Sequence, residues 1–103
     1  MYLCQANHAL IYLGTMNKKK IIFILNPISG TVSKAGIPGL IEERLDKEKF
    51  DCRIAETKYA GHATELAQQA ARQGIDIVVA VGGDGTVNEV GRALVNTKTA
   101  MGI

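Results

Sequence analysis

The chain has 103 residues, of which 47% are hydrophobic and 21% are charged. This length suits one domain with a modest core, and the composition is ordinary for a globular fold. The formal net charge of +2 is too small to indicate a nucleic-acid partner, and no apolar run is long enough to span a bilayer.

The first segment of the chain, residues 1–17, is expected to be a disordered extension upstream of the domain. Met16 reads as a natural chain start, and the apolar patch before it lacks the basic flank of a secretory signal. The domain is expected to cover residues 18–103. The two cysteines, Cys4 and Cys52, show no metal-binding spacing, so both are expected to be free thiols in a reducing compartment.

The first predicted strand is the apolar run at residues 21–25, which reads as a central strand of a parallel sheet. Lys18, Lys19 and Lys20 precede it as a solvated strand start, with attraction to an anionic membrane surface as the alternative. The segment NPISG at residues 26–30 ends the strand, because Pro27 lacks an N–H group and Asn26 favours turns. It is either a ligand-binding loop at the carboxyl end of a strand or an ordinary connection.

Three further elements are predicted before the next loop of interest. Residues 37–45 form an amphipathic helix on a sheet face, with Pro38 in its first turn. Residues 50–57 alternate as a strand near the sheet edge. After the loop at residues 57–61, a helix with an alanine stripe begins at His62 and ends before Gly74, a typical C′ residue. His62 is either structural or close to a ligand.

The next strand, residues 75–81, contains the run VVAV and is expected to be buried on both faces. The segment GGDGTVNE at residues 82–89 follows, and its glycines are expected to allow positive φ and close ligand approach. A helix then extends to about Asn96, with Gly91 letting it lie close to the strand. Its first N–H groups favour an anion such as phosphate. Residues 99–103 begin another strand, and the alternation of elements predicts an α/β fold with a parallel sheet.

The glycine segment does not fit the two commonest phosphate loops. No lysine follows Gly85 as a P-loop requires, and Asn88 stands where the dinucleotide fingerprint needs its third glycine. Asp84 would repel phosphate unless a divalent cation or a hydrogen-bonded amide lies between them. The alternative is a tight turn with Asp84 capping the helix.

The segment GGDGTVNE resembles the signature of the diacylglycerol kinase catalytic domain family. The segment NPISG resembles the first motif of that family, and Thr57 followed by GHA at residues 61–63 resembles its second nucleotide-binding segment. The three motifs occur in the order of the family over about residues 18–103. The resemblance implies a three-layer, Rossmann-like domain of the NAD kinase and diacylglycerol kinase type.

The resemblance also implies a function: an ATP-binding domain of a lipid kinase, which transfers the γ-phosphate of ATP to a lipid hydroxyl such as that of diacylglycerol, with Mg²⁺. It implies a cytoplasmic protein of phospholipid biosynthesis, in contact with the inner membrane face. The implied nucleotide-binding residues are Asn26, Ser29, Thr57, Gly82, Gly83, Asp84, Gly85, Thr86, Val87 and Asn88. Among them, Asp84 is the implied catalytic residue, which orders the loop or orients Mg²⁺.

In this family a larger β-rich domain follows and supplies the lipid pocket, the general base and further metal contacts. The chain by itself is therefore expected to have little kinase activity, and an uncovered sheet edge and face favour a homo-oligomer. The metal ligands and the acceptor lipid stay open. Two alternatives also stay open: an NAD-kinase-like phosphotransferase domain and a non-catalytic nucleotide-binding module.

Overall fold

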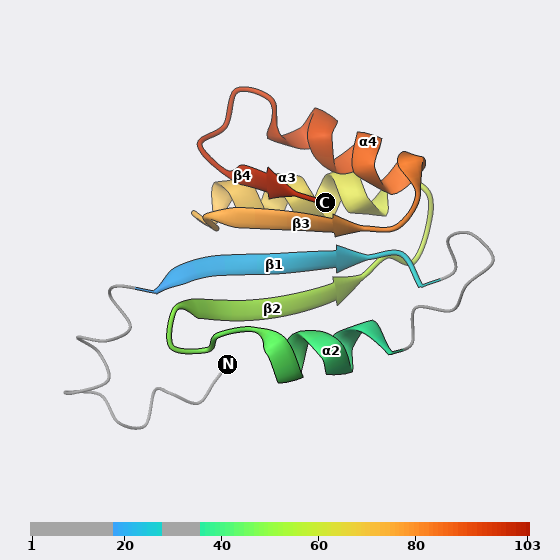
Figure 1. The fold of residues 1–103 in the computed structure, drawn as a ribbon. Helices are drawn as coiled ribbons and strands as arrows, with labels where there is room; N and C mark the ends of the chain where they lie inside the picture. The colour runs from blue at the N-terminus through green and yellow to red at the C-terminus, as the bar shows by residue number, and fades with distance from the viewer. Residues whose placement is uncertain (1–17, 28–35) are drawn as a thin grey trace.

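Four parallel strands form one sheet in the order β2-β1-β3-β4 (Figure 1). The computed structural model describes residues 18–27 and 36–103; the predictions on residues 1–17, which include Cys4, and on Ser29 lie outside these ranges. The strands are β1 (Lys19–Leu25), β2 (Phe50–Glu56), β3 (Ile77–Val81) and β4 (Ala100–Gly102). Phe23 of β1 lies between Ile54 of β2 and Val79 of β3. The predicted parallel sheet, with the first strand central and the second at an edge, is confirmed.

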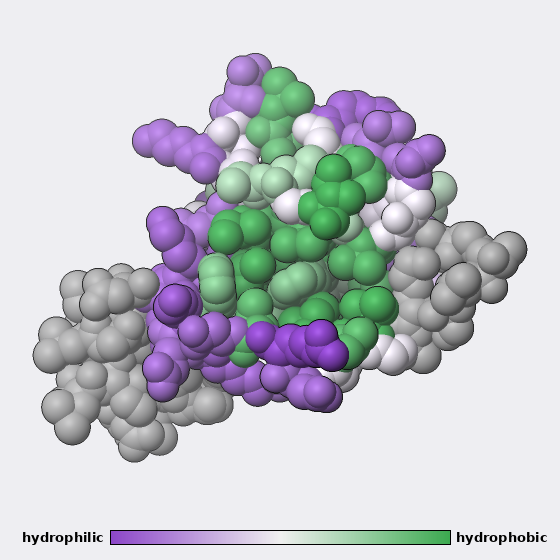
Figure 2. All heavy atoms as spheres, in the orientation of Figure 1, coloured by the Kyte–Doolittle hydropathy of each residue, from purple (hydrophilic) through white to green (hydrophobic). Residues whose placement is uncertain are grey.

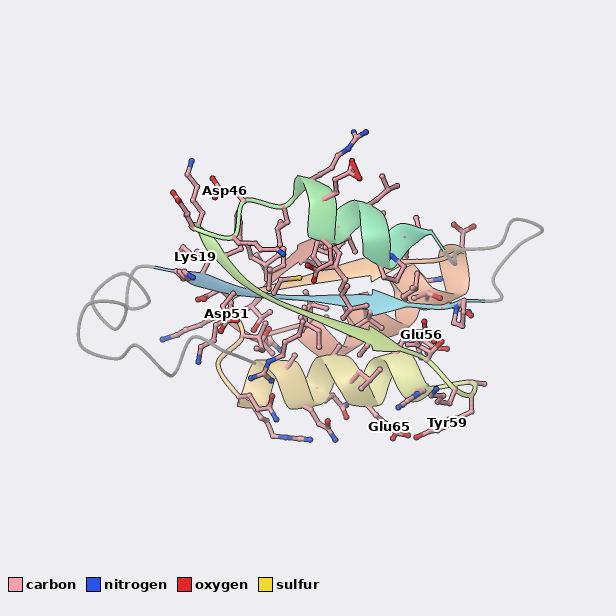
Figure 3. All side chains as sticks on the ribbon, turned by 90° about the horizontal axis from the view of Figure 1, so that it is seen from below. Lys19, Asp46, Asp51, Glu56, Tyr59 and Glu65 are labelled. Atoms are coloured by element: carbon pink, nitrogen blue, oxygen red, sulfur yellow. The ribbon has the colours of Figure 1, made fainter. Side chains whose placement is uncertain are left out.

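Three helices connect the strands and lie on both faces of the sheet. Helix α2 (Ile37–Arg44) follows β1, α3 (His62–Arg72) follows β2, and α4 (Asp84–Leu94) follows β3. Helices α2 and α3 cover opposite faces, whereas α3 and α4 pack against each other (Figure 3). The core lies between these two helices and the sheet. It contains the alanine stripe of α3 and buried residues of β1, β3, α4 and the connection between α3 and β3: Ile24, Ala63, Ala67, Ala70, Ile75, Val78, Ala80, Val90 and Leu94.

The other face of the sheet is only partly covered. Side chains alternate along β3, so Val78 and Ala80 are buried in the core while Val79 points to the other face and is half-buried. Helix α2 has no buried residue, and Leu40 within it is 48% exposed. Apolar side chains therefore form a broad surface over the strands on this side (Figure 2). The prediction of a strand buried on both faces is wrong here, because α2 lies beside β2 and does not cover β3 (Figure 1).

Helix ends follow the turn chemistry of the sequence. Pro38 lies in the first turn of α2, and Gly74 follows the C-cap of α3 with φ +79°, as predicted.

Gly91 was expected to let α4 lie close to the neighbouring strand, and this expectation is wrong. A Cβ at that position would lie 3.7 Å from the Met101 sulfur, which is an ordinary contact, so close packing of α4 does not require glycine. Within the described residues, no helix is long and apolar enough to cross a membrane.

Cys52 lies in β2 as a free, half-buried thiol, as the sequence predicted. Burial raises the pKa of this thiol, and the nearby carboxylates of Glu42 and Asp51 raise it further. A raised pKa keeps the group protonated at neutral pH, and the thiolate is the reactive form. Cys52 is therefore less reactive at neutral pH than a fully exposed thiol.

Candidate functional site

A cleft lies where the carboxyl ends of β1, β2 and β3 meet the first turns of α3 and α4. Its volume is about 360 Å³, near the lower end of small-molecule sites, which are roughly 300–1,000 Å³. The position is the one that ligands occupy in open parallel sheets. The cleft is lined by Asn26, Pro27, Thr57, Lys58, Tyr59, Ala60, Ala63, Gly85, Thr86 and Glu89.

The glycine segment after β3 does not adopt the predicted left-handed conformation. None of Gly82, Gly83 and Gly85 has positive φ, so that expectation is wrong. Gly82 is instead required by close packing: a Cβ there would lie 2.6 Å from Oγ1 of Thr86 and 3.3 Å from Cβ of Asn26. Only a residue without a side chain lets the strand end lie against the first turn of α4.

Asp84 is not the N-cap of α4, because the helix begins at Asp84 itself. Gly83 is the N-cap, with φ −85° and ψ −169°, and Asp84 is the first helical residue, with its side chain exposed. The alternative in which Asp84 caps the helix is therefore wrong. As an acidic residue in the first turn, Asp84 instead complements the helix dipole.

The first turn of α4 contributes Gly85 and Thr86 to the cleft lining. The first intrahelical bond is made by the N–H of Val87, which donates to the Gly83 carbonyl at 3.1 Å. The helix therefore leaves the N–H groups of Asp84, Gly85 and Thr86 without intrahelical acceptors. Gly85 lines the cleft, and a Cβ at that position would meet no described neighbour within 4 Å. The arrangement is suited to an anion.

Hydrogen bonds join the ends of three strands around this turn. The Asn26 N–H donates to the Val81 carbonyl and the Thr57 N–H donates to the Leu25 carbonyl, each at 2.9 Å. The Asn26 side-chain amide also donates to Oγ1 of the buried Thr86, at 3.5 Å. Asn26 and the start of α4 are thus held relative to each other, which preorganises this part of the cleft.

Glu89 connects α4 to the start of α3. Its carboxylate accepts a hydrogen bond from the Gly61 N–H at 3.3 Å, and its backbone carbonyl accepts one from the Thr64 hydroxyl at 3.1 Å. Gly61 is the N-cap of α3 and has φ +88°, a conformation that disfavours side chains. Glu89 lies in the second turn of α4, where it holds the loop that ends at Gly61.

The structure gathers some of the predicted site residues and separates others. Asn26, Thr57, Gly85 and Thr86 line the cleft together, with Gly82 packed against Thr86.

The other predicted residues that the structure describes lie outside the cleft lining. Gly83 and Asp84 stand at the start of α4. Val87 and Asn88 line a separate hollow with Gly91 and Met101.

Several cleft residues could not be selected from the sequence. Tyr59, Lys58 and Glu89 line the cleft, yet Tyr59 and Lys58 carry no recognisable motif signal. Their placement depends on the loop that ends at Gly61. Within the described ranges, no three His, Cys, Asp or Glu side chains are grouped so that they could hold a metal ion.

Comparison with known proteins gives a consistent result. Residues 20–103 match the family described as the diacylglycerol kinase catalytic domain. The chain is 31% identical over 90 residues to a diacylglycerol kinase of Bacillus subtilis, which covers 85% of this chain and 29% of that protein. It is 36% identical over 74 residues to a diacylglycerol kinase of Staphylococcus saprophyticus. That match covers 71% of this chain and 24% of that protein.

A solved structure shows the same fold. The crystal structure of a diacylglycerol kinase from Bacillus anthracis superimposes with a TM-score of 0.62 and 27% identity. The match covers 81% of this chain and 31% of that one. The chain thus spans less than a third of the length of these relatives.

Proposed function

Because the chain belongs to the diacylglycerol kinase catalytic domain family, we propose that it is the ATP-binding part of a lipid kinase. In this proposal the γ-phosphate of ATP is transferred to a lipid hydroxyl such as that of diacylglycerol. The observation that carries the proposal is the first turn of α4: its residues Gly85 and Thr86 line a cleft at the carboxyl edge of the sheet, and their N–H groups have no intrahelical acceptors.

Four of the cleft residues have a specific task in this proposal. The N–H groups of Gly85 and Thr86 bind phosphate oxygens, and Gly85 leaves room for them because it has no side chain. Asn26 and Thr57, which also line the cleft, contact the rest of the nucleotide. The role of the protein is mainly positioning and charge stabilisation, as in phosphoryl transfer generally.

The residues present fit Mg²⁺ only as a shared ion. A closed metal site would need several protein ligands, and no such group exists among the described residues. Mg²⁺ usually keeps several waters and binds through one or two carboxylates together with substrate phosphates. We propose that it arrives with the nucleotide, where it neutralises phosphate charge, and that Asp84, an exposed carboxylate in the first turn of α4, helps to orient it.

The lipid acceptor and the group that activates its hydroxyl are proposed to be held outside these residues, since the chain spans less than a third of its relatives. We therefore expect the 103-residue chain to transfer phosphate poorly, and strong lipid phosphorylation by it would contradict this. A protein acting on membrane lipids is proposed to work at the cytoplasmic face of the membrane.

The test is calorimetric titration of the chain with ATP, with and without Mg²⁺, beside Asn26→Ala and Asp84→Asn. The expected result is binding that depends on metal and is weakened by both changes. Asn26→Ala removes the hydrogen bond to Thr86, and Asp84→Asn removes the carboxylate. Binding unaffected by either change would refute the assigned site.

Two other functions predict different results. An NAD-kinase-like phosphotransferase would phosphorylate NAD rather than lipid when tested in the whole protein. A non-catalytic module would leave the activity of the whole protein intact after Asp84→Asn. The kinase proposal expects a loss of about ten- to a thousand-fold, comparable with removal of one preorganised charge-stabilising group.

A further inference from the structure

Tyr59 is an aromatic residue held at the mouth of the cleft. It lies in the loop between β2 and α3 and lines the cleft, yet it is 55% exposed. Exposed large side chains are common and usually need no explanation. Tyr59 differs because its neighbours fix its position.

Two contacts fix the ring of Tyr59, and a third interaction holds the His62 ring on which it stacks. It stacks on the His62 ring, with centroids 4.4 Å apart and an interplanar angle of 16°. Its hydroxyl donates to Oε1 of Glu65 at 2.8 Å, so that the two side chains point toward each other beside α3 (Figure 3). His62 is itself held, because its Nδ1 accepts a hydrogen bond from the Lys58 N–H at 2.9 Å.

The cleft therefore has two chemically different ends. At one end, the first turn of α4 favours an anion. At the other end, Tyr59 offers an aromatic face whose orientation is already fixed, so little side-chain entropy is left to lose on binding. A ligand with an anionic group and a flat aromatic ring matches both ends. A nucleotide has this combination, whereas an inorganic phosphate has only the first part.

We propose that Tyr59 is the residue on which the purine ring of the bound nucleotide stacks, and that His62 and Glu65 are positioning residues for it. This inference rests on the proposed function as an ATP-binding domain. Stacking of a base on an aromatic side chain does not depend on hydrogen-bond readout. Tyr59 therefore contributes affinity for purine nucleotides without selecting strongly between adenine and guanine.

The test compares ATP with inorganic tripolyphosphate, which has the phosphates without the base. Calorimetric titrations are made with the 103-residue chain, with Tyr59→Ala and with Tyr59→Phe, all with Mg²⁺. Tyr59→Ala is expected to weaken ATP binding about 5- to 100-fold and to leave tripolyphosphate binding within about twofold. Tyr59→Phe keeps the ring and is expected to bind ATP within about threefold of the original chain.

Each other outcome overturns the inference in a recognisable way. If Tyr59→Ala weakens both ligands equally, Tyr59 supports the loop and does not contact the base. If the original chain binds tripolyphosphate as tightly as ATP, the base has no site and only the phosphate site stands. If it binds neither, the inference fails together with the proposed function.

A second measurement does not depend on the folding of Tyr59→Ala. The sequence has three tyrosines and no tryptophan, so Tyr2→Phe with Tyr12→Phe leaves Tyr59 as the single source of tyrosine emission. Stacking on a purine is expected to quench this emission when ATP is added, and tripolyphosphate is expected to leave it unchanged. Emission that ATP does not quench would overturn the inference.

Discussion

Replacement of Gly85 by alanine should strengthen the fold and weaken the site at the same time. Gly85 lies in the first turn of α4, without positive φ, and an added Cβ would meet no described neighbour within 4 Å. Alanine should therefore fit, and it loses less backbone entropy on folding than glycine does. The expected gain is about 0.4–1 kcal/mol in the free energy of unfolding, or a melting temperature higher by about 2–8 °C for a domain of this size.

The same methyl group should obstruct the ligand. Gly85 lines the cleft, and the proposal places phosphate oxygens against its N–H group. A hydrogen bond to a charged group contributes about 1.5–3 kcal/mol, so its loss should weaken ATP binding about 10- to 100-fold. Thermal unfolding and calorimetry on the same sample measure both effects.

Gly39→Ala is the matched control. Gly39 lies in α2, away from the cleft lining, and an added Cβ there also meets no described neighbour within 4 Å. It should raise the melting temperature in the same range and leave ATP affinity unchanged. If Gly85→Ala binds ATP as tightly as the original chain, the first turn of α4 is not the phosphate site, and the reasoning is refuted.

Three further predictions concern packing and protonation around the cleft. Gly82→Ala should lower the free energy of unfolding by about 1–3 kcal/mol through overpacking, since its Cβ would lie 2.6 Å from a hydroxyl oxygen; a melting temperature at or above that of the original chain would contradict this. Glu89→Ala removes the acceptor of the Gly61 N–H and should cost about 1 kcal/mol in chemical unfolding, whereas Glu89→Gln, which keeps an oxygen, should cost less than half of that; equal losses would count against the hydrogen bond. The hydrogen bond to Glu65 raises the pKa of Tyr59, so the folded state holds the phenol proton more tightly than the unfolded state does. The resulting contribution to stability is complete below the unfolded pKa of about 10. It is lost as the pH rises through the higher pKa of the folded state. Tyrosinate absorbance during an alkaline titration should show Tyr59 ionising later in the original chain than in Glu65→Gln, and identical curves would refute this.

The strand and helix order was predictable because local signals agree with the fold. The apolar run at residues 21–25 is followed by Asn26 and Pro27, and the run at residues 77–81 is followed by the glycine segment. Both breaks coincide with the carboxyl ends of adjacent strands, so two motifs far apart in sequence meet. The resemblance to the kinase family implied Asn26, Thr57, Gly85 and Thr86 as site residues, and these four line one cleft.

Other parts of the site depend on tertiary packing and leave no local signal. Glu89 reaches Gly61 across 28 residues only because α3 and α4 pack against each other. The Tyr59–His62 stack depends on the left-handed turn at Gly61, which residue types alone do not specify. Positive φ was wrongly predicted for the glycine segment. Gly82 is needed because the Thr86 side chain leaves no room for a Cβ, and this contact cannot be read from the sequence.

The position of β1 in the sheet has a consequence for synthesis of the protein. The strand is made first, yet its two neighbours follow later along the chain, and the pairing with β3 joins Ile21 to Ile77 and Leu25 to Val81. A nascent chain therefore carries a strongly apolar strand with one edge unpaired until residue 81 has left the ribosome. Such non-local parallel pairing is slow, and transiently exposed strands of this kind aggregate. Yield of folded protein should thus depend more on chaperone supply and temperature during translation than on the stability of the finished fold.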